Sequence, residues 1–271
     1  MLSTEKRNPK TTHFDKMDTA AMLKIISYEN YNSVKAVEAA HKEIAEAIDT
    51  VVKAFENGGR LIYVGAGTSG RIAVMDAAEC PPTYGTDYDT VIAIHAGGEK
   101  AMFRASENIE DSAQKGVEDI LAKGLKPNDV VMGISASGNA EYVAAALQTA
   151  KNIGCVTISL SSNNPCKIAS IADIRIFTDT GAEVITGSTR MKAGNAQKMV
   201  LNMISTCAMV KTGKVYENLM INLKPTNKKL KARMIGIVCD IIGCSAEYAE
   251  NILEKYDWNI RSAVDAVKEK Q

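Results

Sequence analysis

Five short apolar runs, spaced at helix-length intervals, constrain the fold of this chain more than any other feature of its sequence. The runs are LIYV (61–64), TVIAI (90–94), DVVMGIS (129–135), CVTISL (155–160) and DIRIF (173–177). They are apolar throughout and do not alternate with polar residues, which is typical of strands covered on both faces. The sequence therefore predicts an α/β fold with a doubly wound parallel sheet and crossover helices.

Apolar residues at helical spacing are found before the first of these runs and after the last. Apolar positions recur at helical spacing from residue 19 and stop at Gly58-Gly59, so an N-terminal helical segment is expected over 1–57. One long helix is expected at about 189–212. The sheet and this helix together form the predicted central domain, 58–223.

The C-terminal part, 224–271, is expected to be a small helical appendage. Lys224-Pro225 and the basic stretch NKKLKAR (227–233) are interpreted as a linker and a solvated hinge. Three short amphipathic pieces follow, and their apolar residues are Ile235/Ile237/Val238, Tyr248/Ile252/Leu253 and Trp258/Ile260/Val264/Val267.

Composition argues against nucleic acid and membrane partners. Lys and Arg together number 32, as do Asp and Glu, so a small-molecule partner is expected. No apolar run reaches the roughly 20 residues that span a bilayer, and MLSTEKRNPK lacks the apolar core of a signal peptide, which favours a cytoplasmic protein. The six Cys lack C-x-x-C spacing and only His95 of the three His lies near a Gly-rich stretch, so neither a metal site nor a disulfide framework is expected.

The first apolar run leads into Gly65-Ala66-Gly67-Thr68-Ser69-Gly70, a G-x-G-x-x-G pattern that points backbone N–H groups at an anion. A dinucleotide cofactor is the usual ligand of this pattern, and Asp87 or Asp89 could then contact its ribose. The hydroxyls of Thr68 and Ser69 instead suit a single phosphate held at close range. No Lys stands at the Walker A position, which disfavours a nucleoside triphosphate.

Two further hydroxyl-rich loops repeat this arrangement. Ser135-Ala136-Ser137-Gly138-Asn139 follows the third run and opens a helix, which a dinucleotide site would leave unexplained. The third loop, residues 186–192, comes just before the long helix. Ser188 is a good N-cap for that helix, and Arg190 and Lys192 then oppose its dipole unless an anionic ligand lies nearby. The alternative is a pair of exposed surface cations. The phosphate candidates are Thr68, Ser69, Ser135, Ser137 and Ser188, with Arg190 and Lys192 as secondary candidates.

Two carboxylates are candidates for proton transfer. Glu79 stands in Ala-Ala-Glu-Cys-Pro-Pro, where the prolines are expected to end the helix and leave Glu79 at the negative end of its dipole. Burial there would favour the protonated form and suit a general acid, and a solvated helix-end Glu is the alternative. Glu110 is expected beside the apolar stripe of an acid-rich helix, where Glu107 and Asp111 are equally placed on spacing.

The segments LIYVGAGTSGR, AAECPPTYG, SENIEDS, SASG and TGSTRMKAGNAQKMVLNMIST together resemble the N-acetylmuramic acid 6-phosphate etherase family, a member of the sugar isomerase domain group. The likeness extends from RNP at 7–9 to an appendage that resembles a UBA domain. It implies a homodimer without a cofactor, whose sugar isomerase domain removes D-lactate from the phosphorylated cell-wall sugar and leaves N-acetylglucosamine 6-phosphate.

The resemblance also implies roles for individual residues. The two catalytic acids of the family correspond to Glu79 and Glu110, and the hydroxyl-rich loops would hold the phosphate. One carboxylate removes the C2 proton of the opened sugar while an acid protonates the departing ether oxygen, after which water adds. Elimination needs two groups in opposite protonation states, so Glu79 is assigned as the proton donor and Glu110 as the base.

Two other function classes stay open at this point. A non-catalytic sugar-phosphate sensor could use the same loops, and a sugar-phosphate isomerase shares the proton abstraction at C2 but needs no acid for a leaving group. The sequence departs from the family pattern at Ala78, Asn139-Ala140 and Asn195, where Ser, Arg-Thr and Thr are usual. It also ends at EKQ, before a further helical stretch of many relatives, so a shortened appendage is expected. No departure removes a proposed acid, and Asn139 bears on substrate contacts near the second loop.

Overall fold

The computed structural model describes residues 2–104 and 108–268. The chain divides into two compact units, Met1–Ala77 with Asp89–Ala208 and Ala78–Tyr88 with Met209–Gln271. The segment boundaries expected from the sequence, 57/58 and 223/224, stay predictions.

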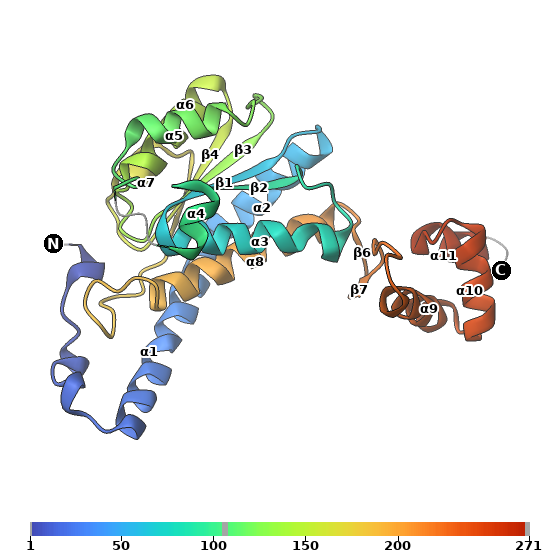
Figure 1. The fold of residues 1–271 in the computed structure, drawn as a ribbon, viewed down its shortest axis with the longest axis horizontal. Helices are drawn as coiled ribbons and strands as arrows, with labels where there is room; N and C mark the ends of the chain where they lie inside the picture. The colour runs from blue at the N-terminus through green and yellow to red at the C-terminus, as the bar shows by residue number, and fades with distance from the viewer. Residues whose placement is uncertain (1, 105–107, 269–271) are drawn as a thin grey trace. The chain divides into compact units, whose positions relative to one another are not determined.

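The first unit is built around a five-stranded parallel sheet with the strand order β2-β1-β3-β4-β5 (Figure 1). Each of the five apolar runs forms one strand, which confirms the predicted sheet. The strands are β1 (Leu61–Gly65), β2 (Val91–His95), β3 (Val130–Ile134), β4 (Val156–Ser161) and β5 (Ile174–Phe177).

Helices cover both faces of the sheet, as expected for a doubly wound fold. Helices α5, α6 and α7 lie on one face, and α2, α8 and the first turns of α3 lie on the other (Figure 1). The Asp76 carboxyl on α3 joins the second face, because it accepts hydrogen bonds from Tyr63 on β1 (3.0 Å) and from Asn202 and Ser205 on α8 (2.7 and 3.1 Å). The α-helices that begin in this unit are α1 (Thr19–Ala39), α2 (His41–Glu56), α3 (Gly67–Tyr84), α4 (Gly98–Phe103), α5 (Ala113–Leu121), α6 (Glu141–Ile153), α7 (Lys167–Ile171) and α8 (Lys192–Lys211).

The N-terminal segment is helical, as predicted, but it forms two long helices that break at Ala40. Three short 3-10 helices precede them and make up an N-terminal arm. They are η1 (Ser3–Glu5), η2 (Pro9–Thr11) and η3 (Phe14–Lys16).

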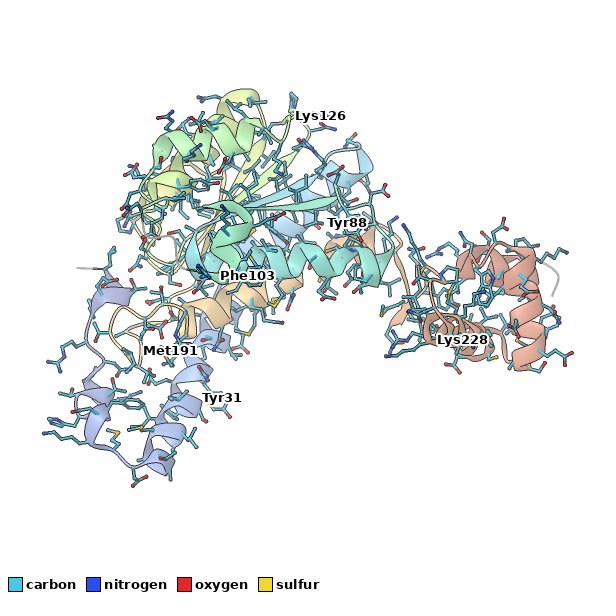
Figure 2. All side chains as sticks on the ribbon, in the orientation of Figure 1. Tyr31, Tyr88, Phe103, Lys126, Met191 and Lys228 are labelled. Carbon is cyan, nitrogen blue, oxygen red and sulfur yellow. The ribbon has the colours of Figure 1, made fainter. Side chains whose placement is uncertain are left out.

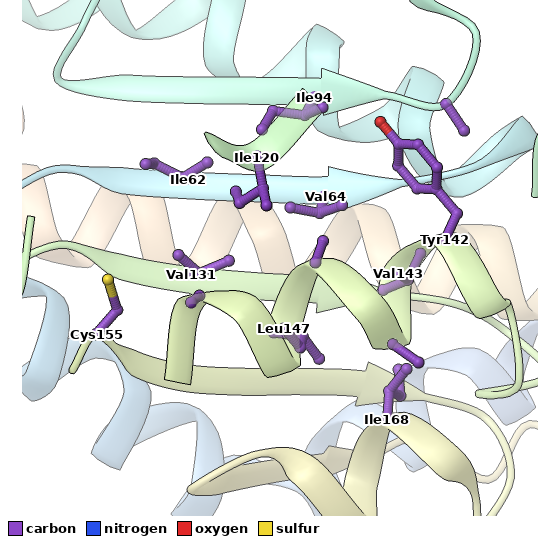
Figure 3. Close-up of a cluster of buried hydrophobic side chains, with 14 of the residues drawn as sticks. Ile62, Val64, Ile94, Ile120, Val131, Tyr142, Val143, Leu147, Cys155 and Ile168 are labelled. Atoms are coloured by element: carbon purple, nitrogen blue, oxygen red, sulfur yellow. The ribbon is translucent and has the colours of Figure 1, made fainter. Parts of the chain in front are cut away.

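The packing of α6 against the sheet sets the position of the loop before that helix. Val143 and Leu147 on α6 lie over Val64 and Val131 of the strands in one buried apolar cluster (Figure 3). Gly133 on β3 lets α6 approach closely, since a Cβ there would lie 2.6 Å from Leu147 Cδ1 and 2.8 Å from Val143 Cγ1. The start of α6 is therefore fixed against the carboxyl end of β3.

The prediction that the prolines end the helix of Glu79 is wrong. Helix α3 contains Pro81 and Pro82 and continues to Tyr84. Each proline leaves the carbonyl four residues earlier without its helical partner but does not stop the turn. The helix ends instead at Gly85, which has a left-handed φ of 65° and donates its N–H to Pro81 O (2.9 Å).

The second unit contains a short hairpin and three helices with an apolar core of their own. The elements are β6 (Val215–Tyr216), β7 (Leu219–Met220), α9 (Lys228–Ile242), α10 (Ala246–Lys255) and α11 (Ile260–Lys268). Buried residues from all three helices meet in this core, among them Met234, Leu253 and Val264. The three predicted amphipathic pieces are confirmed as helices, and the likeness to a UBA domain stays a prediction.

The expected hinge at 227–233 is wrong, because these residues form the cap and first turns of α9. The Asn227 side chain accepts a hydrogen bond from Leu230 N (2.9 Å), as an N-cap residue does. The basic residues are the solvated side of a helix that buries Met234. Within 2–104 and 108–268, no helix is long and apolar enough to cross a membrane.

Candidate functional site

The first predicted loop joins β1 to α3 and forms a tight turn. A Cβ on Gly65 would lie 2.8 Å from Gly70 N, and a Cβ on Gly70 would lie 2.6 Å from Gly65 O. Gly67 has a left-handed φ of 54°. The three glycines of the pattern are therefore required by the turn itself, whatever the ligand.

The hydroxyls of this first loop differ in exposure. Ser69 is buried and Thr68 is half-buried, and both stand in the first turn of α3, where backbone N–H groups lack helical partners. The first loop thus offers an anion N–H groups and two hydroxyls, which fits a phosphate group held at close range.

The second predicted loop joins β3 to α6. Ser135 Oγ accepts a hydrogen bond from Gly138 N (3.1 Å), Ser137 Oγ accepts one from Asn139 N (3.2 Å), and the two hydroxyl oxygens are 3.3 Å apart. Because each oxygen already accepts a backbone N–H, its hydroxyl hydrogen can be donated to an anion. The second loop therefore presents two adjacent hydroxyl donors.

Asn139, where the sequence departs from the family pattern, has a structural role in this loop. Its side-chain oxygen accepts a hydrogen bond from Lys167 N (3.1 Å) at the start of α7, and its amide nitrogen donates to Ser137 O (3.3 Å). Asn139 thus holds the second loop against α7.

The first and second loops lie side by side at the carboxyl edge of the sheet. Strands β1 and β3 are neighbours, and Gly65 at the end of β1 pairs with Ile134 at the end of β3. Their crossover connections leave in opposite directions, because β2 lies on one side of β1 and β3 on the other. Such a switch point is where open α/β sheets bind ligands, so the topology brings Thr68, Ser69, Ser135 and Ser137 to the expected place.

After the third predicted loop, the long helix begins differently from the expectation. Helix α8 begins at Lys192, and Ser188 is not its cap. The fully buried Glu183 carboxylate caps it instead, accepting hydrogen bonds from Lys192 N (3.1 Å) and Ala193 N (3.0 Å). Burial raises the pKa of Glu183 although these two N–H groups lower it. The positive end of α8 is therefore occupied by the protein's own carboxylate.

The prediction that Lys192 binds the phosphate does not agree with its surroundings. Its side chain is 2% exposed, and Nζ contacts Glu29 Oε2 and Ala182 O, both at 2.7 Å. Burial raises the pKa of Glu29, but hydrogen bonds from Lys192, Lys10 and Asn8 outweigh this and hold the pKa below its usual value. Lys192 therefore belongs to a buried ion pair that joins α1 to α8.

Arg190 and Ser188, unlike Lys192, are not buried. Arg190 is exposed and Ser188 is half-buried. A Cβ on Gly194 of α8 would lie 3.4 Å from Thr68 Cγ2 and 3.5 Å from Thr189 O, so this glycine lies beside both the first and the third loop. Ser188 and Arg190 therefore remain candidates near the first loop.

The N-terminal arm reaches the second loop through Asn163, a residue that sequence reasoning missed. The buried Asn163 side chain accepts a hydrogen bond from Ser3 N (2.7 Å) and donates to Thr4 Oγ1 and to Ala136 O, both at 3.0 Å. No sequence signal marks this asparagine, because its partners are 27 to 160 positions away.

The two candidate acids are both exposed. Glu79 lies within α3. Glu110 lies in the turn before α5, not in the expected helix, because Ser112 caps α5 by accepting a hydrogen bond from Lys115 N (3.3 Å). Glu110 O accepts a hydrogen bond from Tyr142 N (3.0 Å), which ties this turn to the first turn of α6. Asp111 is in the same turn, and Glu107 lies outside the described residues.

All six cysteines are free. In the part of the chain that the structure describes, no group of three or more His, Cys, Asp or Glu side chains could hold a metal ion.

Comparisons with known proteins agree with the fold. A sequence model of the family described as glucokinase regulatory protein N-terminal SIS domain matches residues 43–151. A solved structure of a phosphoheptose isomerase from Francisella tularensis has a TM-score of 0.52 and 18% identity, and the match covers 73% of this chain and 98% of that one. The sheet and the matching family model indicate a sugar isomerase (SIS) domain in this part of the chain.

Two curated relatives match nearly the whole chain. N-acetylmuramic acid 6-phosphate etherase of Clostridium botulinum (strain Loch Maree / Type A3) is 51% identical over 97% of this chain and 87% of its own length. N-acetylmuramic acid 6-phosphate etherase 2 of Vibrio parahaemolyticus serotype O3:K6 is 48% identical over 97% of this chain and 88% of its own length. The chain belongs to the N-acetylmuramic acid 6-phosphate etherase family.

The buried ion pair gives a test of stability. We expect Lys192→Met to lower the free energy of unfolding by about 3–5 kcal/mol, because it leaves Glu29 buried without its nearest cation. Urea unfolding followed by circular dichroism measures the change. Lys10→Met is the matched control, since Lys10 also contacts Glu29 (3.0 Å) but is 54% exposed, and we expect a much smaller loss. Equal losses in the two variants would contradict the buried pair.

Proposed function

We propose that this chain cleaves the D-lactyl ether of N-acetylmuramic acid 6-phosphate, giving N-acetylglucosamine 6-phosphate and D-lactate in cell-wall sugar recycling. The observation that carries the proposal is the pair of hydroxyl-bearing loops, side by side at the carboxyl ends of β1 and β3. This geometry suits a phosphate, and the chain is about half identical to relatives named for this activity.

The phosphate is held by the first and second loops. Thr68 and Ser69 contribute hydroxyls beside the free N–H groups of α3, and Ser135 and Ser137 donate from the start of α6. Ser188 and Arg190 are additional contacts from the third loop. Lys192 is left out of this set, because its ammonium group is already paired with Glu29.

The reaction is an elimination followed by addition of water. After the sugar ring opens, a base takes the C2 proton beside the aldehyde, the C3–O bond breaks, and an acid protonates the ether oxygen of the departing lactate. Water then adds its hydroxyl group at C3 and gives its proton to the deprotonated acid, while the protonated base returns its proton to C2, so both groups regain their original protonation states. The sum is one substrate and one water converted into one N-acetylglucosamine 6-phosphate and one D-lactate.

Glu110 is the proposed base and Glu79 the proposed proton donor. The hydrogen bond from Tyr142 N to Glu110 O supports the first assignment, because it fixes the turn of Glu110 to the helix that begins at the second loop. Glu79 is assigned as the donor because elimination needs a second carboxyl in the opposite protonation state. Both carboxylates are exposed.

Two isosteric variants test the acids. We expect Glu79→Gln and Glu110→Gln each to lower the rate of lactate release by about 10²–10⁴-fold, the usual contribution of a positioned acid or base. Deuterium exchange at C2 separates the roles, because the Glu110 variant should lose exchange and the Glu79 variant can retain it. Glu46→Gln, on an exposed face of α2, is the control. Lactate release at the unchanged rate in either acid variant would contradict its role.

The same assay decides between the function classes. A sugar-phosphate sensor would bind N-acetylglucosamine 6-phosphate tightly and release no lactate from N-acetylmuramic acid 6-phosphate. An isomerase would interconvert glucosamine or fructose 6-phosphate with other sugars. The etherase proposal requires lactate release by the unmodified protein.

The proposal includes a cytoplasmic homodimer. Six free cysteines support a reducing compartment. Exposed apolar side chains on α1 support the dimer, since Leu23, Tyr31 and Val34 are 60%, 65% and 43% exposed. Figure 2 labels Tyr31 on this helix. Aromatic and aliphatic side chains of this kind are enriched where subunits meet.

A charge among these side chains tests the dimer. We expect the unmodified protein to sediment at twice the chain mass of 29.1 kDa, and Tyr31→Glu to shift it toward one chain mass, because a buried carboxylate disfavours an apolar interface. Tyr248→Glu on α10, at a tyrosine that is 49% exposed, is the matched control. A single chain mass for the unmodified protein, or an intact dimer of Tyr31→Glu, would contradict this interface.

A further inference from the structure

The imidazole of His95 bridges the end of β2 and the first loop. The side chain is buried, with Nδ1 2.7 Å from Ala96 O and Nε2 3.2 Å from Gly67 O. The ring also packs on Gly70, where a Cβ would lie 2.6 Å from His95 Cδ2. His95 is therefore the side chain that fastens the first loop to the neighbouring strand.

Both partners of the ring are carbonyl oxygens, which only accept hydrogen bonds. A neutral imidazole has one N–H, so one of its nitrogens then faces a carbonyl with a lone pair. A doubly protonated imidazolium donates to both carbonyls. The two contacts together are thus satisfied only by the charged ring, and the neutral ring leaves one of the two carbonyls without a donor from His95.

The described charged groups around His95 include both signs. The start of α3 is the positive end of a helix dipole and opposes a cation there. His95 lines a cavity of about 660 Å³ whose other described charged lining residues are Glu99 of α4 and Lys115, Asp119 and Lys123 on or next to α5. Arg71 of α3 donates to Ala101 O (2.7 Å) and Met102 O (2.9 Å) of α4. Among the described residues, two anions thus face two lysines and this arginine, with no excess of negative charge to hold an imidazolium.

A phosphate dianion on the N–H groups of Thr68 and Ser69 would change this balance. It would place two negative charges on the loop that His95 contacts through Gly67 O. A nearby anion favours the charged form of a histidine, and histidine is the side chain that changes charge most readily near neutral pH. Phosphate binding and ring protonation therefore reinforce each other.

We propose that His95 is a positioning residue that takes up a proton from solvent when a sugar phosphate binds the first loop. The imidazolium then donates to Ala96 O and Gly67 O at once and holds the loop closed on the phosphate. This inference rests on the proposed phosphate site, and it adds a proton-linked step to binding that the elimination chemistry does not require.

Nitrogen-15 NMR of histidine-labelled protein tests the proposal directly. At pH 7.5 a phosphate monoester is already a dianion, since its second pKa is about 6, so any proton uptake belongs to the protein. We expect N-acetylglucosamine 6-phosphate to move both ring nitrogens of His95 to the resonance positions of the protonated ring. His13 and His41 are exposed, lie outside the site and serve as controls in the same spectrum. A His95 ring that stays neutral at saturation would overturn the proposal.

The backbone amides of residues 68–70 separate this proposal from the proposed function. If they shift on ligand addition while His95 stays neutral, the phosphate site stands and the role of His95 is wrong. If they do not shift, the phosphate site and the role of His95 both fail.

Calorimetry in buffers of different ionisation enthalpy gives an independent readout. We expect net proton uptake on ligand binding to the unmodified protein and to His41→Gln, and its loss in His95→Gln together with a several-fold weaker affinity. Unchanged proton uptake in a folded His95→Gln variant would overturn the proposal. If that variant does not fold, the ring-nitrogen spectrum of the unmodified protein decides.

Discussion

The close approach of β1 to the first turn of α3 is the constraint on which the candidate site depends. Gly65 and Gly70 meet with no room for a Cβ, and the ring of His95 fills the space beside them. This packing leaves the first N–H groups of α3 at the carboxyl edge of the sheet, next to the loop that follows β3. The glycine pattern, usually associated with dinucleotides, is thus explained by the tight strand-to-helix turn alone. The hydroxyls of Thr68 and Ser69, and not the glycines, indicate which ligand binds there.

Two buried carboxylates stabilise the start of α8, next to the third loop. Glu183 caps α8 and Glu29 pairs with Lys192, so buried carboxylates neutralise both the helix end and the cation that follows the third loop. The N-terminal arm joins this network through Asn8, which donates to Glu29 Oε2 (2.9 Å), and it reaches the second loop through Asn163. Residues far apart in the chain therefore hold the second and third loops in place.

The sequence predicted the sheet because each apolar run is long enough for one buried strand, and it predicted the loops because hydroxyls follow β1 and β3. It could not predict the partners of Lys192, since Glu29 is 163 positions away and helix dipole arguments see only local charges. The sequence rule that proline ends a helix gave the wrong end for α3, because that rule considers only local residues. The helix ends at Gly85, where a Cβ would lie 2.1 Å from Asn222 O. Glu110 was expected in a helix but lies in a turn, because Ser112 caps α5 and the helix begins only after it.

The central claim is that one sugar phosphate is anchored between the loops after β1 and β3. A crystal structure of the protein with N-acetylglucosamine 6-phosphate tests it most directly. The account predicts phosphate density within hydrogen-bond distance of the backbone N–H groups of Thr68 and Ser69 and of the Ser135 and Ser137 hydroxyls. A phosphate bound elsewhere on the chain, with both loops empty at saturating ligand, would contradict it.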